Sequence, residues 1–192
     1  IQTTDAAAIT KINSFPFVQS FTAVALLKNN TITPAKFAAL PVPPAAVIPN
    51  RVEKVYADTF NYGSSLNQVK IHKGEFLHNI GARGQGMIMA FLDAGFFGYQ
   101  TNQFFDSARA RNQFLGTWDF VQNEVSVNED NSHGMQCFST AAAYRPGVFV
   151  GSSPEAKYFL LRTEDAPTEQ IIEEYNWALA AEYADSAGVD VI

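Results

Sequence analysis

The chain has 192 residues, of which 47% are hydrophobic and 17% are charged, so it can bury the core of one sizeable domain. Its 13 Lys and Arg stand against 19 Asp and Glu, a formal net charge of −6, and this acidic balance argues against nucleic acid and anionic membrane surfaces as partners. No apolar stretch is long enough to span a membrane, and the single cysteine, Cys137, leaves no internal disulfide.

The first 55 residues form two segments of different composition. In residues 1–29, Asp5 is placed to cap a short helix that carries Ala8, Ile9 and Ile12, and an apolar, strand-like run follows at 17–27. Residues 30–55 hold five prolines and little charge. Because proline fixes φ and removes an amide donor, this second segment is predicted to be an extended linker.

From about residue 56 onward, strand and helix patterns alternate. Strands are predicted at 87–92, 114–121, 157–163 and 189–192, and helices at 66–80 (interrupted at Gly74), 133–144 and 168–186. In the last helix, apolar side chains recur at helical spacing at Ile171, Ile172, Tyr175, Ala178 and Leu179. Strands that alternate with helices predict an α/β fold with a doubly wound, mostly parallel sheet.

Asp93 and His133 are the candidate catalytic residues. Asp93 ends the apolar strand at 87–92, at the edge where such sheets place functional side chains. His133 follows Asn131 and Ser132, which are good N-cap residues, so it should begin a helix. A histidine that acts as a general base needs a fixed tautomer and a nearby negative charge, and Asp93 would supply both. The order Asp then His also occurs in known catalytic triads.

The residues around this pair resemble the subtilisin-like serine proteases (subtilases). Residues 92–95 are similar to the family's aspartate motif, 132–135 to its histidine motif, and 151–157 to the turn before its next strand. Residues 62–70 resemble the start of the mature enzyme, and 184–192 resemble the helix and strand that lead into the substrate-binding region. Two positions depart from the family's pattern, because Ala94 stands where Thr or Ser is usual and Met135 where Thr is usual.

The resemblance implies a secreted bacterial serine endopeptidase that acts on peptides or proteins. Residues 56–192 would be the N-terminal half of a subtilisin-like catalytic domain, residues 1–29 the end of a small α+β inhibitory propeptide, and residues 30–55 the processing segment of this zymogen. The nucleophilic serine and the oxyanion-hole asparagine would lie beyond Ile192, so the downstream half of the same domain would be the chain's partner. The chemistry would need no cofactor, although Asp106 falls where subtilases often place a structural calcium ligand.

Two other functions stay open from the sequence. The chain could be a non-catalytic, truncated homologue that binds peptides or a partner, or a small-molecule-binding α/β domain in which Asp93 contacts the ligand. The second of these leaves the histidine motif unexplained. Cys137 is expected to be a packing residue, and His72 and His78 lack the spacing and the carboxylate neighbours of a metal site. A run of acidic residues is expected to be a solvated helix start, namely Glu164, Asp165, Glu169, Glu173 and Glu174.

The catalytic interpretation makes a geometric prediction. A carboxylate oxygen of Asp93 should lie about 2.6–3.2 Å from a ring nitrogen of His133. A separation of more than about 8 Å between the two side chains would contradict the interpretation, because no hydrogen bond could then form without moving the backbone.

The linker makes a second prediction. Limited proteolysis should cut residues 30–55 before it cuts residues 87–163, since proline-rich, low-charge segments between packed units are accessible to proteases. The order of cleavage can be read by mass spectrometry of a digestion time course. Equal protection of both regions would argue against a processing segment at 30–55.

Overall fold

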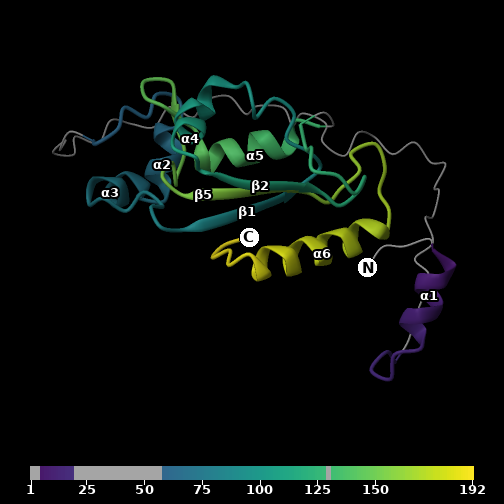
Figure 1. Cartoon of the computed structure of the whole chain (residues 1–192). Helices are drawn as coiled ribbons and strands as arrows, with labels where there is room; N and C mark the ends of the chain where they lie inside the picture. Colours follow the sequence, from purple (N-terminus) through teal and green to yellow (C-terminus); the bar gives the residue numbers. More distant parts are fainter. Residues whose placement is uncertain (1–4, 20–57, 129–130) are drawn as a thin grey trace.

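A computed structural model describes residues 5–19, 58–128 and 131–192 (Figure 1). From residue 58 onward the described residues form a mixed α/β fold around a small parallel sheet. The elements in chain order are α1 (Ala6–Asn13), α2 (Leu66–Ile71), α3 (Gly74–Asn79), β1 (Ile88–Asp93), η1 (Gln103–Phe105), α4 (Asp106–Ala110), β2 (Phe114–Asp119), α5 (His133–Ala142), β3 (Tyr144–Arg145), β4 (Phe149–Val150), β5 (Lys157–Arg162) and α6 (Ile172–Ser186). None of the helices in these ranges is both long and apolar enough to cross a bilayer.

The main sheet has the order β1-β5-β2, and both pairs of strands are parallel. The register aligns Asp93 of β1 with Arg162 of β5, and Arg162 in turn with Asp119 of β2. The strand predicted at 189–192 is reduced to one parallel bridge between Val191 and Met89, on the side of β1 away from β5. The carboxyl ends of the three strands therefore meet at a single edge of the sheet, which carries three charged residues.

Helices cover both faces of the sheet, with α5 on one face and α6 on the other (Figure 1). In β5, Tyr158 and Leu160 pack in the cluster with α5, whereas Phe159 and Leu161 pack in the cluster with α6. Because successive side chains of a strand point to opposite faces, a central strand between two helical layers must be apolar at nearly every position. This explains the uninterrupted apolar run of β5.

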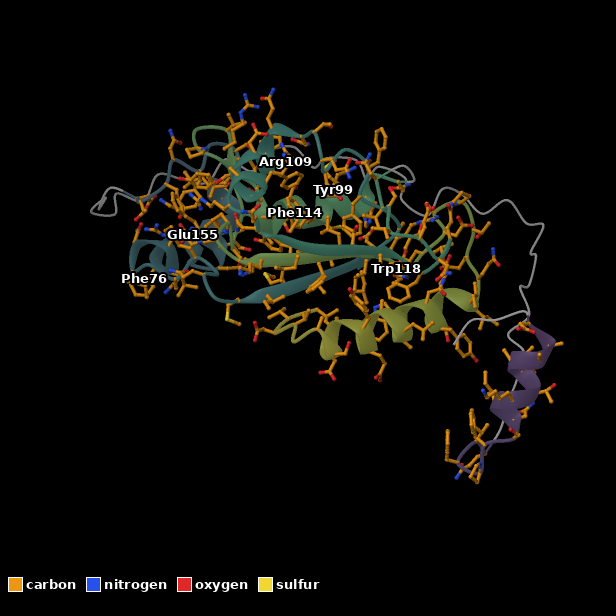
Figure 2. The ribbon with its side chains drawn as sticks, in the orientation of Figure 1. Phe76, Tyr99, Arg109, Phe114, Trp118 and Glu155 are labelled. Atoms are coloured by element: carbon orange, nitrogen blue, oxygen red, sulfur yellow. The ribbon has the colours of Figure 1, made fainter. Side chains whose placement is uncertain are left out.

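An irregularity in β2 lets this strand contribute to both layers. The register with β5 shifts between Phe114 and Gly116. Phe114 accordingly packs on the α5 side and Trp118 on the α6 side, although strict alternation would place both on one face (Figure 2). At Gly116 a Cβ atom would lie 3.0 Å from the ring of Phe159, so glycine keeps the two strands close at the shift.

Most of the predicted elements are present, with ends that differ by up to four residues. Strands β1, β2 and β5 and helices α5 and α6 match their predicted ranges, and the helix at 66–80 is divided into α2 and α3 at Lys73, which has a positive φ of 56°. Asp5 caps α1 as predicted, since its Oδ1 accepts from the Ala7 amide at 2.8 Å. The linker at 30–55 and most of the strand predicted at 17–27 lie outside the described residues.

The apolar residues that recur at helical spacing in the sequence of α6 do not form its buried face. Ile171 and Tyr175 are each 50% exposed, and the buried residues of the helix are Glu173, Asn176, Ala180 and Ala184. Alanine at two successive turns lets the helix backbone approach the sheet, which large side chains would prevent. The two polar residues are satisfied where they are buried, because Asn176 donates to the Thr163 carbonyl at 3.4 Å and Glu173 accepts from the Asp165 amide at 3.1 Å.

Short elements were not predicted. The sequence prediction continued α5 to Tyr144, but residues 144–145 pair with 149–150 in an antiparallel hairpin. The short helices η1 and α4 occupy the connection between β1 and β2. Elements of two to five residues contain too few positions for a hydrophobic period to be recognised.

A buried ion pair joins the strands at the carboxyl edge. Arg162 is 3% exposed and donates through Nη1 to Oδ2 of Asp119, which is fully buried, at 2.7 Å. The Arg162 Nε also donates to the Ala94 carbonyl at 3.2 Å. One side chain of the central strand thus holds the end of β2 and the segment that follows β1.

We predict that Arg162→Met lowers the free energy of unfolding by about 3–5 kcal/mol, because Asp119 is left as a buried charge without its partner. Urea denaturation followed by tryptophan fluorescence measures this change. The matched control is Arg111→Met: Arg111 is half exposed and lies 4.0 Å from Glu155, so its loss should change stability by less than about 1 kcal/mol. Equal effects of the two substitutions would contradict the prediction.

Candidate active site

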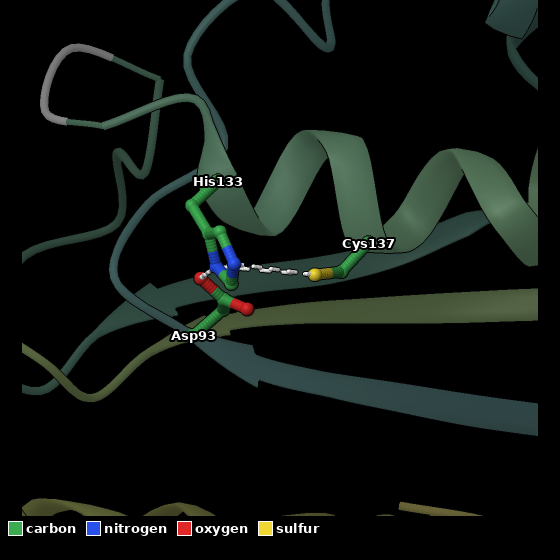
Figure 3. A group of neighbouring side chains, drawn as sticks. All are labelled: Asp93, His133 and Cys137. Carbon is green, nitrogen blue, oxygen red and sulfur yellow. Dashed lines mark hydrogen bonds and ion pairs between the residues drawn. The ribbon is translucent and has the colours of Figure 1, made fainter. Parts of the chain in front are cut away.

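The two predicted catalytic residues meet at the carboxyl edge of the sheet (Figure 3). Asp93 is the last residue of β1, and His133 is the first residue of α5. The distance between His133 Nδ1 and Asp93 Oδ1 is 2.8 Å. The geometric prediction made from the sequence is therefore confirmed.

The alternation of β1 places Asp93 on the correct face. Met89 and Phe91 pack in the cluster with α5, and the next residue in this alternation is Asp93. Two backbone contacts then hold it: its Oδ1 accepts from the Ala94 amide at 2.7 Å, and its carbonyl accepts from the Thr163 amide at 2.9 Å. With a side chain that is 13% exposed, Asp93 is a fixed and largely desolvated acceptor.

His133 is positioned by the way α5 begins. Ser132 occupies the N-cap position but makes no side-chain capping bond, and Asn131 Oδ1 accepts from the His133 amide at 2.7 Å instead. The next residue, Gly134, is in tight contact with β1, since a Cβ atom there would lie 2.6 Å from the Gly95 carbonyl oxygen and 2.8 Å from Asp93 Cβ. Only glycine lets the helix begin this close to the strand end.

Asp93 and His133 lie at the carboxyl ends of β1 and β5, and the chain leaves these two neighbouring strands toward opposite sides of the sheet. From β1 the chain continues to β2, beyond β5, whereas from β5 it continues through α6 to Val191 on the other side of β1. In open α/β sheets, ligands bind outside the carboxyl ends of the strands at such a point. The site therefore has both the residues and the location of a functional centre.

The hydrogen bond assigns roles to the two imidazole nitrogens. An ionised carboxylate can only accept, so Nδ1 of His133 carries the proton that Asp93 binds, and Nε2 is the nitrogen for proton transfer. The His133 side chain is 36% exposed, so a reacting group can approach it from solvent. This arrangement is that of a general base with its orienting carboxylate.

Cys137 lies beside Asp93 and His133. The sequence analysis expected a packing residue at this position and did not predict the contact. Cys137 lies one turn further along α5, and its Sγ is 3.8 Å from each ring nitrogen of His133. Burial raises the pKa of the Cys137 thiol, and the nearby negative charge of Asp93 raises it further. A nucleophilic cysteine needs the opposite shift, so this thiol is not an activated nucleophile. The i, i+4 spacing from His133 was the signal for this contact.

The serines near α5 are engaged in other contacts. Ser139 Oγ donates to the Gln136 carbonyl at 2.6 Å, and Ser132 Oγ accepts from the Gln136 side chain at 3.2 Å. Ser152 and Ser153 follow β4, and their amides bond to carbonyls near the other end of α5. The sequence interpretation assigned the nucleophile to none of these serines, and this assignment stays a prediction.

Asp106 is the first residue of α4. Its carboxylate forms an ion pair with Arg109, and its side chain is 68% exposed. Arg109 also donates to the Tyr99 carbonyl at 2.7 Å and so holds the connection between β1 and β2 (Figure 2). Calcium binding by Asp106 stays a prediction.

His78 has a structural role. It is 1% exposed, and its Nδ1 lies 2.7 Å from the Tyr62 hydroxyl while its Nε2 lies 2.8 Å from the Ser152 carbonyl oxygen. The carbonyl can only accept, so Nε2 carries the proton and Tyr62 donates to Nδ1. Burial raises the pKa of Tyr62 to about 12, which keeps it a donor at neutral pH.

The acidic run surrounds a hollow beside α6. A cavity of about 340 Å³ is lined by Glu164, Glu169, Glu173, Glu174 and Trp177. The charge of Glu164 also raises the pKa of the Cys137 thiol, so this acidic surface begins close to Asp93 and His133. The sequence predicted that these acidic residues form a solvated helix start. In the structure they line a hollow, and Glu173 is buried.

Comparison with known proteins gives no match, either among family models or among curated proteins. The assignment of this site therefore depends on its motifs and its geometry.

The raised pKa of the Cys137 thiol allows a test of its contact with Asp93. Replacing Asp93 by Asn removes the charge that raises the pKa of Cys137, so this pKa should fall and alkylation by iodoacetamide at neutral pH should become faster. Each unit of decrease multiplies the thiolate fraction about tenfold while the pH is below the pKa. Asp106→Asn is the control and should leave the alkylation rate unchanged. A slower reaction in Asp93→Asn would contradict the charge assignment.

Proposed function

We propose that this chain supplies the aspartate and histidine of a subtilisin-like serine endopeptidase. The observation that carries the proposal is the 2.8 Å contact between Asp93 and His133 at the carboxyl edge of a parallel sheet. The two residues belong to motifs that resemble those of the family, in the family's order. A fixed imidazole with an ionised partner is the general-base half of a hydrolytic triad.

The geometry gives each residue a step in peptide hydrolysis. His133 Nε2 takes the proton of a serine hydroxyl as its oxygen attacks the peptide carbonyl, and then gives that proton to the leaving amine. Asp93 keeps Nδ1 protonated and stabilises the imidazolium that forms in between. The nucleophile of this proposal is a serine outside the 192 residues, as the resemblance to the family implies.

The proposal extends to the rest of the fold. The layers formed by α5 and α6 on opposite faces support a doubly wound sheet, and the bridge at Val191 supports a further strand beside β1. Residues 1–29 would then be a propeptide remnant, residues 30–55 the processing segment, and the whole enzyme a secreted bacterial zymogen. The acidic hollow near Glu164 would lie beside the bound peptide.

We predict that the 192-residue chain alone neither hydrolyses a general peptide substrate nor reacts with a fluorophosphonate serine probe. Adding the polypeptide encoded downstream of Ile192 should produce both activities, because the serine and the oxyanion donor would then be present. In subtilisin itself, loss of the histidine costs on the order of 10⁶ in turnover and loss of the aspartate on the order of 10⁴. His133→Ala and Asp93→Asn should show losses in this order in the combined protein.

His72→Ala is the matched control, since His72 ends α2 and is exposed, so the substitution should leave turnover unchanged. Stoichiometric labelling of the chain alone by the probe would show that the nucleophile lies within it. A combined protein that reacts equally well with and without His133 would overturn the proposal.

A further inference from the structure

The catalytic pair and Cys137 form a group of three metal-binding side chains. One ligand atom from each of Asp93, His133 and Cys137 lies within 4.8 Å of the others, and this is the one such group of three or more found among the described residues. A carboxylate, an imidazole and a thiol from two adjoining elements converge on one point (Figure 3).

We propose that Asp93, His133 and Cys137 bind a zinc-type divalent cation, and that the bound ion displaces the hydrogen bond between Asp93 and His133. The ion binding itself does not depend on the proposed peptidase function. Its consequence does: an ion on His133 would inhibit a peptidase that uses this histidine as its base.

The separations of Asp93 and Cys137 from His133 are close to those of ligands on tetrahedral zinc. With Zn–S of about 2.3 Å and Zn–N of about 2.0 Å, a sulfur and a nitrogen on one ion lie about 3.5 Å apart. The observed separation of Cys137 Sγ from each His133 nitrogen is 3.8 Å, so a small side-chain rotation brings them into range. The distance between Asp93 Oδ1 and His133 Nδ1 must increase from 2.8 Å to about 3.3 Å when both atoms bind the ion. The ion then takes the place of the proton between them.

Charge and exposure fit as well. A carboxylate and a thiolate together balance the two positive charges of the ion, and the imidazole binds in its neutral form. Binding therefore moves the Nδ1 proton to Nε2 and releases the thiol proton to solvent. Three protein ligands leave the fourth position to water, and the 36% exposed His133 side chain leaves an entry path from solvent.

The ligand types select the metal. Thiolate and imidazole favour zinc and cobalt over magnesium and calcium, which prefer oxygen ligands. The site is therefore distinct in its chemistry from the calcium role predicted for Asp106.

The test uses the 192-residue chain itself, titrated with Co²⁺ and Zn²⁺. We expect one Co²⁺ per chain, with thiolate-to-cobalt charge-transfer absorption that Zn²⁺ abolishes and Ca²⁺ does not. The low-field NMR signal of the His133 Nδ1 proton should disappear as Zn²⁺ binds. Cys137→Ser, a near-isosteric change, should weaken Zn²⁺ binding at least about 100-fold, since loss of even an outer-shell partner costs about 10–100-fold.

His72→Ala is the control for binding to an exposed histidine and should retain the cobalt spectrum. Absence of charge-transfer absorption in the unsubstituted chain, or equal Zn²⁺ affinity in Cys137→Ser, would overturn the proposal. Zinc binding by a chain that shows no peptidase activity after addition of the downstream polypeptide would support the metal site while the proposed function fails. The two proposals can therefore be judged separately.

Discussion

The contact between the first turn of α5 and the end of β1 is the constraint on which the site depends. At Gly134 the helix backbone touches Asp93 and the Gly95 carbonyl so closely that no side chain fits between them. This contact fixes the distance from His133 to Asp93 at 2.8 Å. The same approach brings the ring of Phe138, one turn further along α5 than Gly134, to a centroid distance of 5.3 Å from the ring of Phe91, so the packing of the core and the geometry of the pair support each other.

The carboxyl edge of the sheet carries both a structural ion pair and the candidate site. The register aligns Asp93, Arg162 and Asp119, and Arg162 forms its buried ion pair with Asp119. The Oδ1 atom of Asp93 is left to the Ala94 amide and to His133. Arg162, which pairs with Asp119 and also lies 3.5 Å from the carboxylate of Asp165, therefore holds the edge together, while Asp93 orients the imidazole of His133.

The position of Cys137 gives the pair two incompatible states. With a proton on Nδ1, His133 is oriented by Asp93 and would act through Nε2 in the proposed peptidase. With an ion at that nitrogen, the same three side chains become ligands and the imidazole no longer serves as a base. The 3.8 Å separation of the thiol from both ring nitrogens is close enough for the second state without disturbing the first. Activity of the proposed peptidase would then depend on the availability of free zinc-type ions.

Local sequence patterns were enough to predict the elements with a clear hydrophobic period and the contact between Asp93 and His133. Strands β1 and β5, the break between α2 and α3, and the helix start at His133 depend on local patterns of apolar, capping and glycine residues. Three features could be seen only in the folded chain: the buried face of α6, the pairing of Arg162 with Asp119, and the contact of Cys137 with His133. These outcomes depend on the strand register and on how closely the backbones of α6, α5 and the sheet approach. A local sequence pattern contains information on neither.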